Sequence, residues 1–274
     1  MTKREQEFIE TRLPENAPRT DDPWFSKKEL IASLRTPTIW SFMLSQALVN
    51  MGNYALTWYL PTITTSLGFA SLPRNQLLNI PPAFAAVITI IFAAWFIRQA
   101  FIPRPAFIMI IMVGQIVCFI LFFTISNPVG IYIACILGTA FTQTYFIPFW
   151  AWRSSTLKGS TGAAFTLGFQ NCVGQVGGVV GPQIFLEKWA YNRYKNSFAI
   201  AASAVIAAAF SNLLTWWLTR NVELDVLRIA RLRRQAQKEG RIFSEDDVHV
   251  FEERDYGSFF KLGDKNGQVR QSSV

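Results

Sequence analysis

The chain has 274 residues, of which 51% are hydrophobic and only 16% are charged, and its formal net charge at pH 7 is +8. No Asp or Glu occurs between positions 30 and 186. A soluble domain covers its surface with charged side chains of both signs, so this composition excludes a soluble globular fold. It predicts an all-α integral membrane protein.

Six apolar segments reach the roughly 20 residues that a helix needs to cross the hydrocarbon core of a bilayer. These predicted spans lie at 39–60, 77–97, 106–125, 129–151, 162–186 and 198–219. The connections between them are short, so neighbouring helices are predicted to run antiparallel. The chain is thereby divided into a polar N-terminal segment (1–37), a six-helix bundle (38–219) and a polar C-terminal tail (220–274).

The basic residues predict the orientation of this bundle, because Lys and Arg beside membrane spans are retained in the cytoplasm. An even number of spans places both termini on one side, and 22 of the 26 Lys and Arg residues lie there. Both termini are therefore predicted to be cytoplasmic. The positive charge lies beside the spans and reflects topology, so nucleic acid is not an expected partner.

The tail begins with a basic segment that is predicted to form an amphipathic helix. This helix either lies on anionic lipid at the membrane surface or is solvated, and the sequence leaves both open. A flexible segment is predicted to follow it.

No catalytic or metal site is expected. An intramembrane serine protease needs a His as general base within the membrane, but the single histidine, His249, lies in the tail. The predicted spans contain no carboxylate. Cys118, Cys135 and Cys172 all fall within spans and show neither disulfide nor metal-ligand spacing. We therefore expect no enzyme and no cofactor, which leaves transport.

Polar residues are concentrated in the first, second, fourth and fifth spans. In the first span, four of them are spaced by 4, 3 and 4 positions and share one helix face: Gln46, Asn50, Asn53 and Thr57. Polar amides are costly in lipid and usually face a bundle interior or an aqueous cavity. These four spans are therefore predicted to line a cavity, while the third and sixth lie outside. The alternative is that the amides only join helices to one another.

On the cavity interpretation, amides bind a small-molecule substrate by hydrogen bonds and aromatic rings stack on it. The candidate substrate-contacting residues are Asn50, Asn53, Tyr54, Trp58, Gln143, Tyr145, Asn171 and Gln175.

The fifth span contains the glycine-rich stretch "GFQNCVGQVGGVVGP". Gly174 with Gly178, and Gly177 with Gly181, form two overlapping Gly-x-x-x-Gly sets. Small residues let membrane helices approach closely, and Pro182 is predicted to end or kink the helix. These five residues are candidates for helix packing together with gating, and packing alone remains open.

Several sequence elements, in order, resemble the C-terminal half of a major facilitator superfamily transporter. They are "PTIWSFMLSQALVNMGNYALTWYLPTI", "LLNIPP", "IPFWAW", "GQVGGVVGP" and "YNRYKNSFAI". The resemblance is to the fungal allantoate permease type of the anion:cation symporter family. It implies helices seven to twelve of a twelve-helix fold, arranged as two inverted three-helix repeats, with helices one to six missing.

The resemblance also implies alternating-access uptake of a small organic anion, a ureide or a vitamin across the plasma membrane. The family's loop between helices eight and nine carries an Asp-Arg pair, whereas "FIRQAFIPRPAF" keeps Arg98 and Arg104 without the Asp. Those two residues are interpreted as topology signals. The group that couples a proton, and any Arg that neutralises the substrate, are expected in the other half.

The implied partners are the lipid bilayer and either a second six-helix half or a second copy of the chain. A truncated, non-transporting membrane protein or a regulatory subunit is the alternative function.

Overall fold

The computed structural model describes residues 27–66, 77–125, 127–157, 160–185, 189 and 194–240. Its ordered elements within these ranges are helices, as predicted. They are α2 (Lys27–Arg35), α3 (Pro37–Ser66), α5 (Ile80–Arg98), α6 (Arg104–Thr124), α7 (Pro128–Ser155), α8 (Ser160–Gln183) and α9 (Lys195–Lys238). The chain forms two compact units, Met1–Leu224 and Asp225–Val274, and α9 contributes residues to both.

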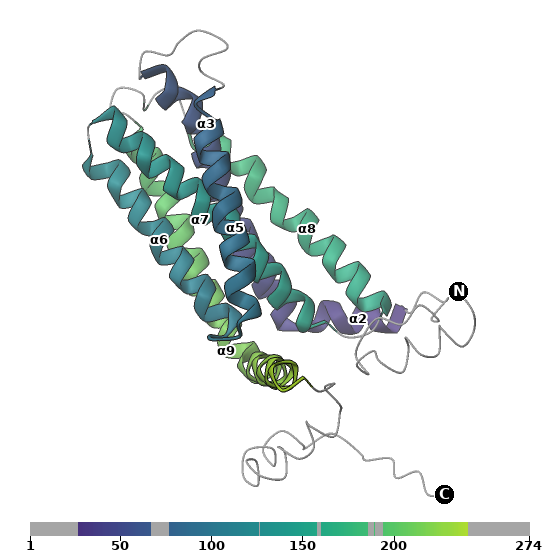
Figure 1. Cartoon of the computed structure of the whole chain (residues 1–274). Coiled ribbons are helices and arrows are strands. Elements are labelled where there is room, and N and C mark those ends of the chain that lie inside the picture. Colours follow the sequence, from purple (N-terminus) through teal and green to yellow (C-terminus); the bar gives the residue numbers. More distant parts are fainter. Residues whose placement is uncertain are drawn as a thin grey trace, which may run out of the picture. The chain divides into compact units, whose positions relative to one another are not determined.

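The helices of the first unit pack side by side as a bundle (Figure 1). α3 packs against α8 along most of its length and also contacts α7, while α7 contacts α5 and α6. The short helix α2 lies against α8. The bundle thus places α3, α7 and α8, three of the helices richest in polar groups, next to one another.

Proline and asparagine set the starts of three helices. α5, α6 and α7 each have Pro in the first turn, where its missing N–H costs no hydrogen bond. At the start of α7 the side chain of Asn127 accepts a hydrogen bond from the Val129 N–H at 3.1 Å, which caps the helix.

Aromatic rings fill the contacts between helices. Phe42 of α3 meets Trp152 of α7 with ring centroids 4.9 Å apart. Phe122 of α6 stacks on Phe198 of α9 at 5.0 Å. Such ring pairs add to the apolar burial that holds the helices together.

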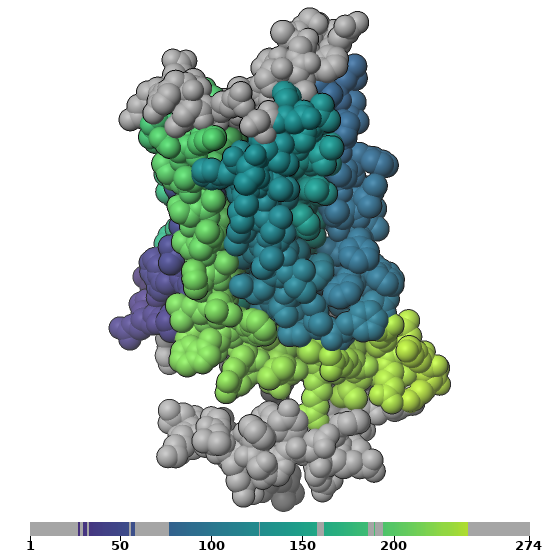
Figure 2. Space-filling view, turned by 90° about the vertical axis from the view of Figure 1, so that its left-hand side faces the viewer, coloured from purple at the N-terminus to yellow at the C-terminus, as the bar shows by residue number. Residues whose placement is uncertain are grey.

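α5, α6 and the first part of α9 lie at the outer surface of the bundle (Figure 2), and large apolar side chains are exposed on all three. Phe84 of α5, Ile110 of α6 and Phe210 of α9 are all more than 60% exposed, and Phe92 and Phe96 of α5 stack at 6.0 Å. Large apolar side chains cover the surface of a protein whose solvent is lipid. The chain is an integral, multi-pass membrane protein.

Four described helices are long and apolar enough to cross a membrane by length and composition: α5, α6, α7 and α9. α3 and α8 have 30 and 24 residues but are not among the four, because amides and glycines lower their hydropathy. The sixth predicted span, 198–219, lies within the longer helix α9, which continues without a break to Lys238.

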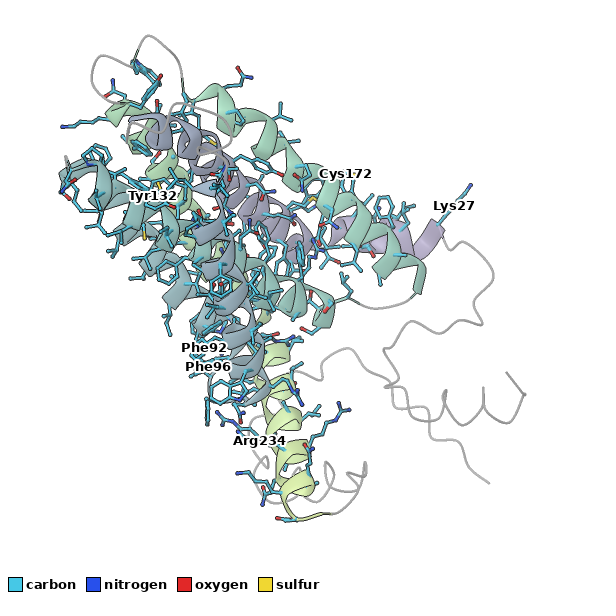
Figure 3. All side chains as sticks on the ribbon, turned by 45° about the horizontal axis from the view of Figure 1, so that its top comes forward. Lys27, Phe92, Phe96, Tyr132, Cys172 and Arg234 are labelled. Carbon is cyan, nitrogen blue, oxygen red and sulfur yellow. The ribbon has the colours of Figure 1, made fainter. Side chains whose placement is uncertain are left out.

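The three cysteines differ in exposure. Cys118 and Cys135 are buried within the bundle, whereas Cys172 is exposed on α8 (Figure 3). Residues 1–26 and the tail after residue 240, including the predicted flexible segment, lie outside the described residues.

Candidate functional site

A cluster of three polar side chains joins α3, α7 and α8. Arg153 of α7 donates from Nη1 to Oε1 of Gln46 at 3.1 Å and to Oδ1 of Asn171 at 3.2 Å. Gln46 also donates from Nε2 to the same Asn171 oxygen at 3.4 Å. Gln46 and Arg153 are buried, whereas Asn171 is exposed. We call Gln46, Arg153 and Asn171 the arginine cluster.

The polar stripe of α3 continues along the contact with α8. One turn after Gln46, Asn50 is buried and donates from Nδ2 to the carbonyl oxygen of Gly174 at 2.8 Å. One turn further, the hydroxyl of Tyr54 donates to Oε1 of Gln175 at 3.1 Å, and both side chains are exposed. Asn50 therefore acts as an interhelical hydrogen-bond donor, and Tyr54 and Gln175 lie at an open face.

Asn53 points into a second, fully buried group, the inner cluster of Asn53, Gln115 and Thr142. Gln115 donates from Nε2 to Oδ1 of Asn53 at 2.7 Å and to Oγ1 of Thr142 at 3.2 Å, and Thr142 donates to Asn53 at 3.1 Å. The inner cluster ties α3, α6 and α7 together. Gln115, which the sequence placed on an outer helix, is an interior residue.

The inner cluster gives a prediction for stability. Replacing Gln115 by Leu leaves the oxygen of Asn53 with one donor instead of two, and we expect a loss of about 1–2 kcal/mol in the free energy of unfolding. Titration of detergent-solubilised protein with a denaturing detergent measures this loss. Thr124→Val is the control, because Thr124 is exposed and its hydrogen bonds to described residues go to carbonyls of its own helix. Equal stability of the two variants would contradict the prediction.

Of the remaining candidate residues, the structure describes the side chains of Tyr145 and Gln143, both on α7. Tyr145 is fully buried, stacks on Phe149 at 5.0 Å and accepts from Nδ2 of Asn212 at 3.1 Å. It therefore links α7 to α9 and has no surface for a ligand in this structure. Gln143 is exposed on α7. The side chain of Trp58 lies outside the described residues.

Three of the four candidate glycines of α8 face α3. A Cβ atom added at Gly174 would lie 2.6 Å from the side chain of Gln46, and one at Gly178 would lie 2.7 Å from the ring of Tyr54. At Gly177 it would meet the backbone of Ala47, 2.8 Å from the carbonyl carbon and closer to the oxygen. Gly181 is buried, and Pro182 is the last residue but one of α8.

The structure joins two charged residues that the sequence analysis did not pair. Arg104 and Glu223 form an ion pair with Nη2 and Oε1 2.7 Å apart and a second bond from Nε to Oε2 at 3.1 Å. Arg104 also donates to the Ala151 carbonyl and to Ser155. Glu223 is 1% exposed. The sequence assigned Glu223 to the tail because the sixth span was predicted to end before it.

The fourth span is predicted to end at residue 151, which puts Arg153 among the basic residues that lie beside the spans. In the structure α7 continues to Ser155, and the side chain of Arg153 is buried in the bundle. The signal available in the sequence was the pair "WR", in which a large aromatic residue extends the apolar face past the predicted end.

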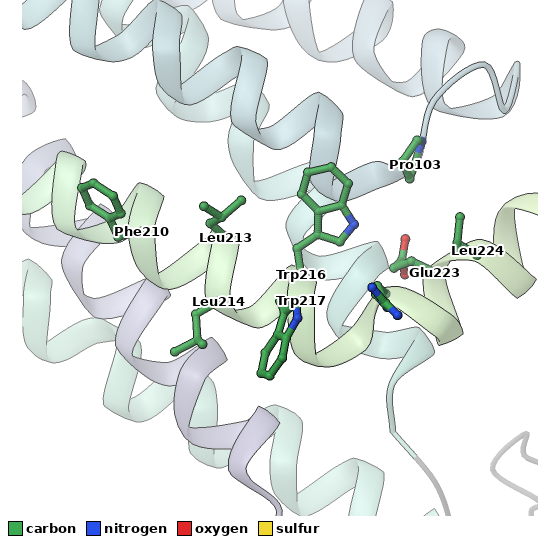
Figure 4. Close-up of a pocket in the computed structure, with 9 residues that line it drawn as sticks. Pro103, Phe210, Leu213, Leu214, Trp216, Trp217, Glu223 and Leu224 are labelled. Carbon is green, nitrogen blue, oxygen red and sulfur yellow. The ribbon is translucent and has the colours of Figure 1, made fainter. Parts of the chain in front are cut away.

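A separate groove of about 650 Å³ lies along α9 (Figure 4). The groove is lined by Pro103, Phe210, Leu213, Leu214, Trp216, Trp217, Arg220, Glu223 and Leu224. This lining is mostly apolar and includes none of the predicted site residues.

Comparison with known proteins identifies similar transporters. Residues 7–182 match the family model described as the Major Facilitator Superfamily. An uncharacterised transporter of Schizosaccharomyces pombe is 24% identical over 230 residues, which cover 81% of this chain and 44% of the relative. A high-affinity nicotinic acid transporter of Saccharomyces cerevisiae is 27% identical over 235 residues, covering 79% of this chain and 40% of the relative.

The chain thus spans about two fifths of the length of these curated relatives. No solved structure matches it.

Proposed function

The chain belongs to the Major Facilitator Superfamily, and on that premise we propose that it forms one half of a secondary transporter for a small organic anion. Six membrane helices, α3 and α5 to α9, would correspond to helices seven to twelve and form two inverted three-helix repeats. Both termini would be cytoplasmic and the membrane would be the plasma membrane. The resemblance to allantoate permeases of the anion:cation symporter family supports this assignment.

One observation carries the proposal: polar side chains are exposed on one face of a surface that is elsewhere apolar. Tyr54, Asn171 and Gln175 are exposed where α3 meets α8, while most of the exposed residues of α5 and α6 are apolar. Exposed amides in hydrocarbon are costly. This face is therefore suited to water and substrate rather than to lipid.

The second side of the cavity would come from another six-helix bundle, since one bundle cannot enclose a site that opens alternately to each side. The partner would be a second half of the same family or a second copy of this chain. The substrate would bind between the two bundles, with Gln143, Asn171 and Gln175 among its hydrogen-bond partners.

Uptake of radiolabelled nicotinate and allantoate tests the proposal. The cells would lack their own carriers and would express the chain alone or with a second six-helix half of the family. We expect uptake only with the second half, and we expect Gln175→Leu to lower it at least tenfold with unchanged membrane insertion. Such a loss corresponds to about 1.4 kcal/mol, within the range of a hydrogen bond that is left unmade.

Val113→Leu is the matched control, because Val113 is an exposed apolar residue of α6, and its uptake should equal that of the unaltered chain. No uptake under either condition, or full uptake by Gln175→Leu, would contradict the proposed role.

Asn50 and Asn53 are hydrogen-bonded within the bundle, which favours a second candidate function, a subunit that associates with another transporter without transporting on its own. Co-expression with a twelve-helix relative distinguishes the two. A regulatory subunit would change the uptake rate of that relative, whereas a transporting half would leave it unchanged.

A further inference from the structure

Arg153 is a buried cation that bonds no carboxylate among the described residues. Arg153 is 3% exposed. It donates hydrogen bonds to two neutral amide oxygens, those of Gln46 and Asn171. Its Nε has no hydrogen-bond partner among the described residues. The carboxylate that α9 brings to the bundle, Glu223, is bound to Arg104.

Burial of an unpaired charge is unfavourable because the charge loses its hydration and gains no counter-charge. Amide oxygens compensate for only part of this loss. A carboxylate would form shorter and roughly twice as strong bonds with the same N–H groups, and the planar guanidinium suits its two oxygens. The arginine cluster thus lacks one component, and that component is an anion.

The cluster is reached through Asn171, the one exposed member of the three. Its Oδ1 accepts from both Arg153 and Gln46. Rotation of this single side chain would free Nη1 of Arg153 toward the open face of α3 and α8. On that face Gln175 lies one turn beyond Asn171 on α8, and Tyr54 lies two turns beyond Gln46 on α3.

We propose that Arg153 binds the carboxylate of the transported anion, and that the amide oxygen of Asn171 occupies the position of that carboxylate when the site is empty. The inference rests on the proposed function. It changes one expectation from the sequence, that an arginine neutralising the substrate belongs to the other half. Asn171 then acts as the exchangeable group and Gln46 as a fixed second acceptor.

One substitution, Asn171→Asp, distinguishes an anion-binding role of Arg153 from a purely structural role. Asn171→Asp places a permanent carboxylate beside the guanidinium. If the cluster is an anion site, this variant is more stable than the unaltered chain without ligand and no longer responds to a carboxylate ligand. If Arg153 only joins three helices, the variant gains stability but its response to ligand is unchanged.

The experiment measures thermal unfolding of the full chain in lipid nanodiscs with nicotinate, allantoate or nicotinamide. Nicotinamide has the ring of nicotinate without its charge. We expect either carboxylate to raise the midpoint temperature and nicotinamide to leave it unchanged. We expect Asn171→Asp to raise the midpoint without ligand and to weaken carboxylate binding at least tenfold.

Asn127→Asp is the matched control, since Asn127 is exposed and caps α7, and Asp also caps helices well. Its response to nicotinate should equal that of the unaltered chain. Arg153→Gln should abolish the rise in midpoint temperature that the carboxylates cause. If that variant does not fold, the result for Asn171→Asp still tests the anion site. A response retained in Asn171→Asp, or no response of the unaltered chain to either carboxylate, overturns the inference.

Uptake is measured separately, so the two proposals can fail independently. Carboxylate binding that depends on Arg153 without any uptake supports the anion site and contradicts transport. Uptake that is undiminished in Asn171→Asp supports transport and contradicts the anion site.

Discussion

Replacing Gly177 by Ala is expected to destabilise the bundle by about 3 kcal/mol, because the added methyl group has no space. Gly177 faces the backbone of Ala47 on α3, and a Cβ atom there would also lie 3.0 Å from the nitrogen of Met51. Backbone atoms cannot rotate away as a side chain can, so α8 would have to move away from α3. That displacement would separate the hydrogen-bonded pairs along this contact, Asn50 with Gly174 and Tyr54 with Gln175.

The control lies on the same helix. Gly168 is exposed and has no heavy atom within 4 Å of an added Cβ, so Gly168→Ala should raise stability by up to ~1 kcal/mol through helix propensity. Denaturing-detergent titration compares both variants with the unaltered chain. If Gly177→Ala proves as stable as Gly168→Ala, the result would contradict the close approach of α3 and α8 at Gly177.

Breaking the ion pair of Arg104 and Glu223 is expected to have a similarly large effect. Glu223→Gln removes the only carboxylate bonded to Arg104 among the described residues, and a guanidinium that is only 14% exposed is left without its counter-charge. Removal of one partner of a buried pair costs about 3–5 kcal/mol. The pair joins the start of α6 to α9, and Ser155 of α7 bonds both partners, so we expect all three helices to lose stability together.

Two comparisons test this expectation by the same titration. Glu239→Gln changes an exposed residue just after the end of α9, which accepts a hydrogen bond from Gln235 four residues earlier, and its effect should be near zero. The double variant Arg104→Met with Glu223→Leu should be more stable than Glu223→Gln, since it leaves no unpaired charge. If the loss of stability in the double variant equalled the sum of the losses at Arg104 and at Glu223, the two residues would not be a coupled pair.

The helices could be predicted from the sequence because hydrocarbon imposes a minimum length on apolar runs. Each predicted span overlaps one described helix, from α3 to α9. The ends of the helices could not be predicted in the same way. A predicted span ends where charged residues begin, whereas a helix continues as long as its backbone is hydrogen-bonded. α7 therefore includes Arg153, and α9 includes Glu223.

The composition of the candidate site could be predicted only in part. The polar stripe of α3 follows from a spacing of 4, 3 and 4, but helix periodicity does not show which neighbour each amide meets. Asn53 turns toward Gln115 in the interior, while Gln46 meets Arg153. Residues 62 and 107 positions apart come together only once the helices are packed.

Because the three cysteines differ in exposure, cysteine labelling of the unaltered chain can report whether α8 is accessible. Cys172 is exposed beside Asn171, whereas the sulfur atoms of Cys118 and Cys135 lie inside the bundle. A maleimide should consequently alkylate one position per chain, with a rate set by access of water and reagent to α8. Slower alkylation after a companion protein is added would show that α8 has become covered, without any mutation or crystal.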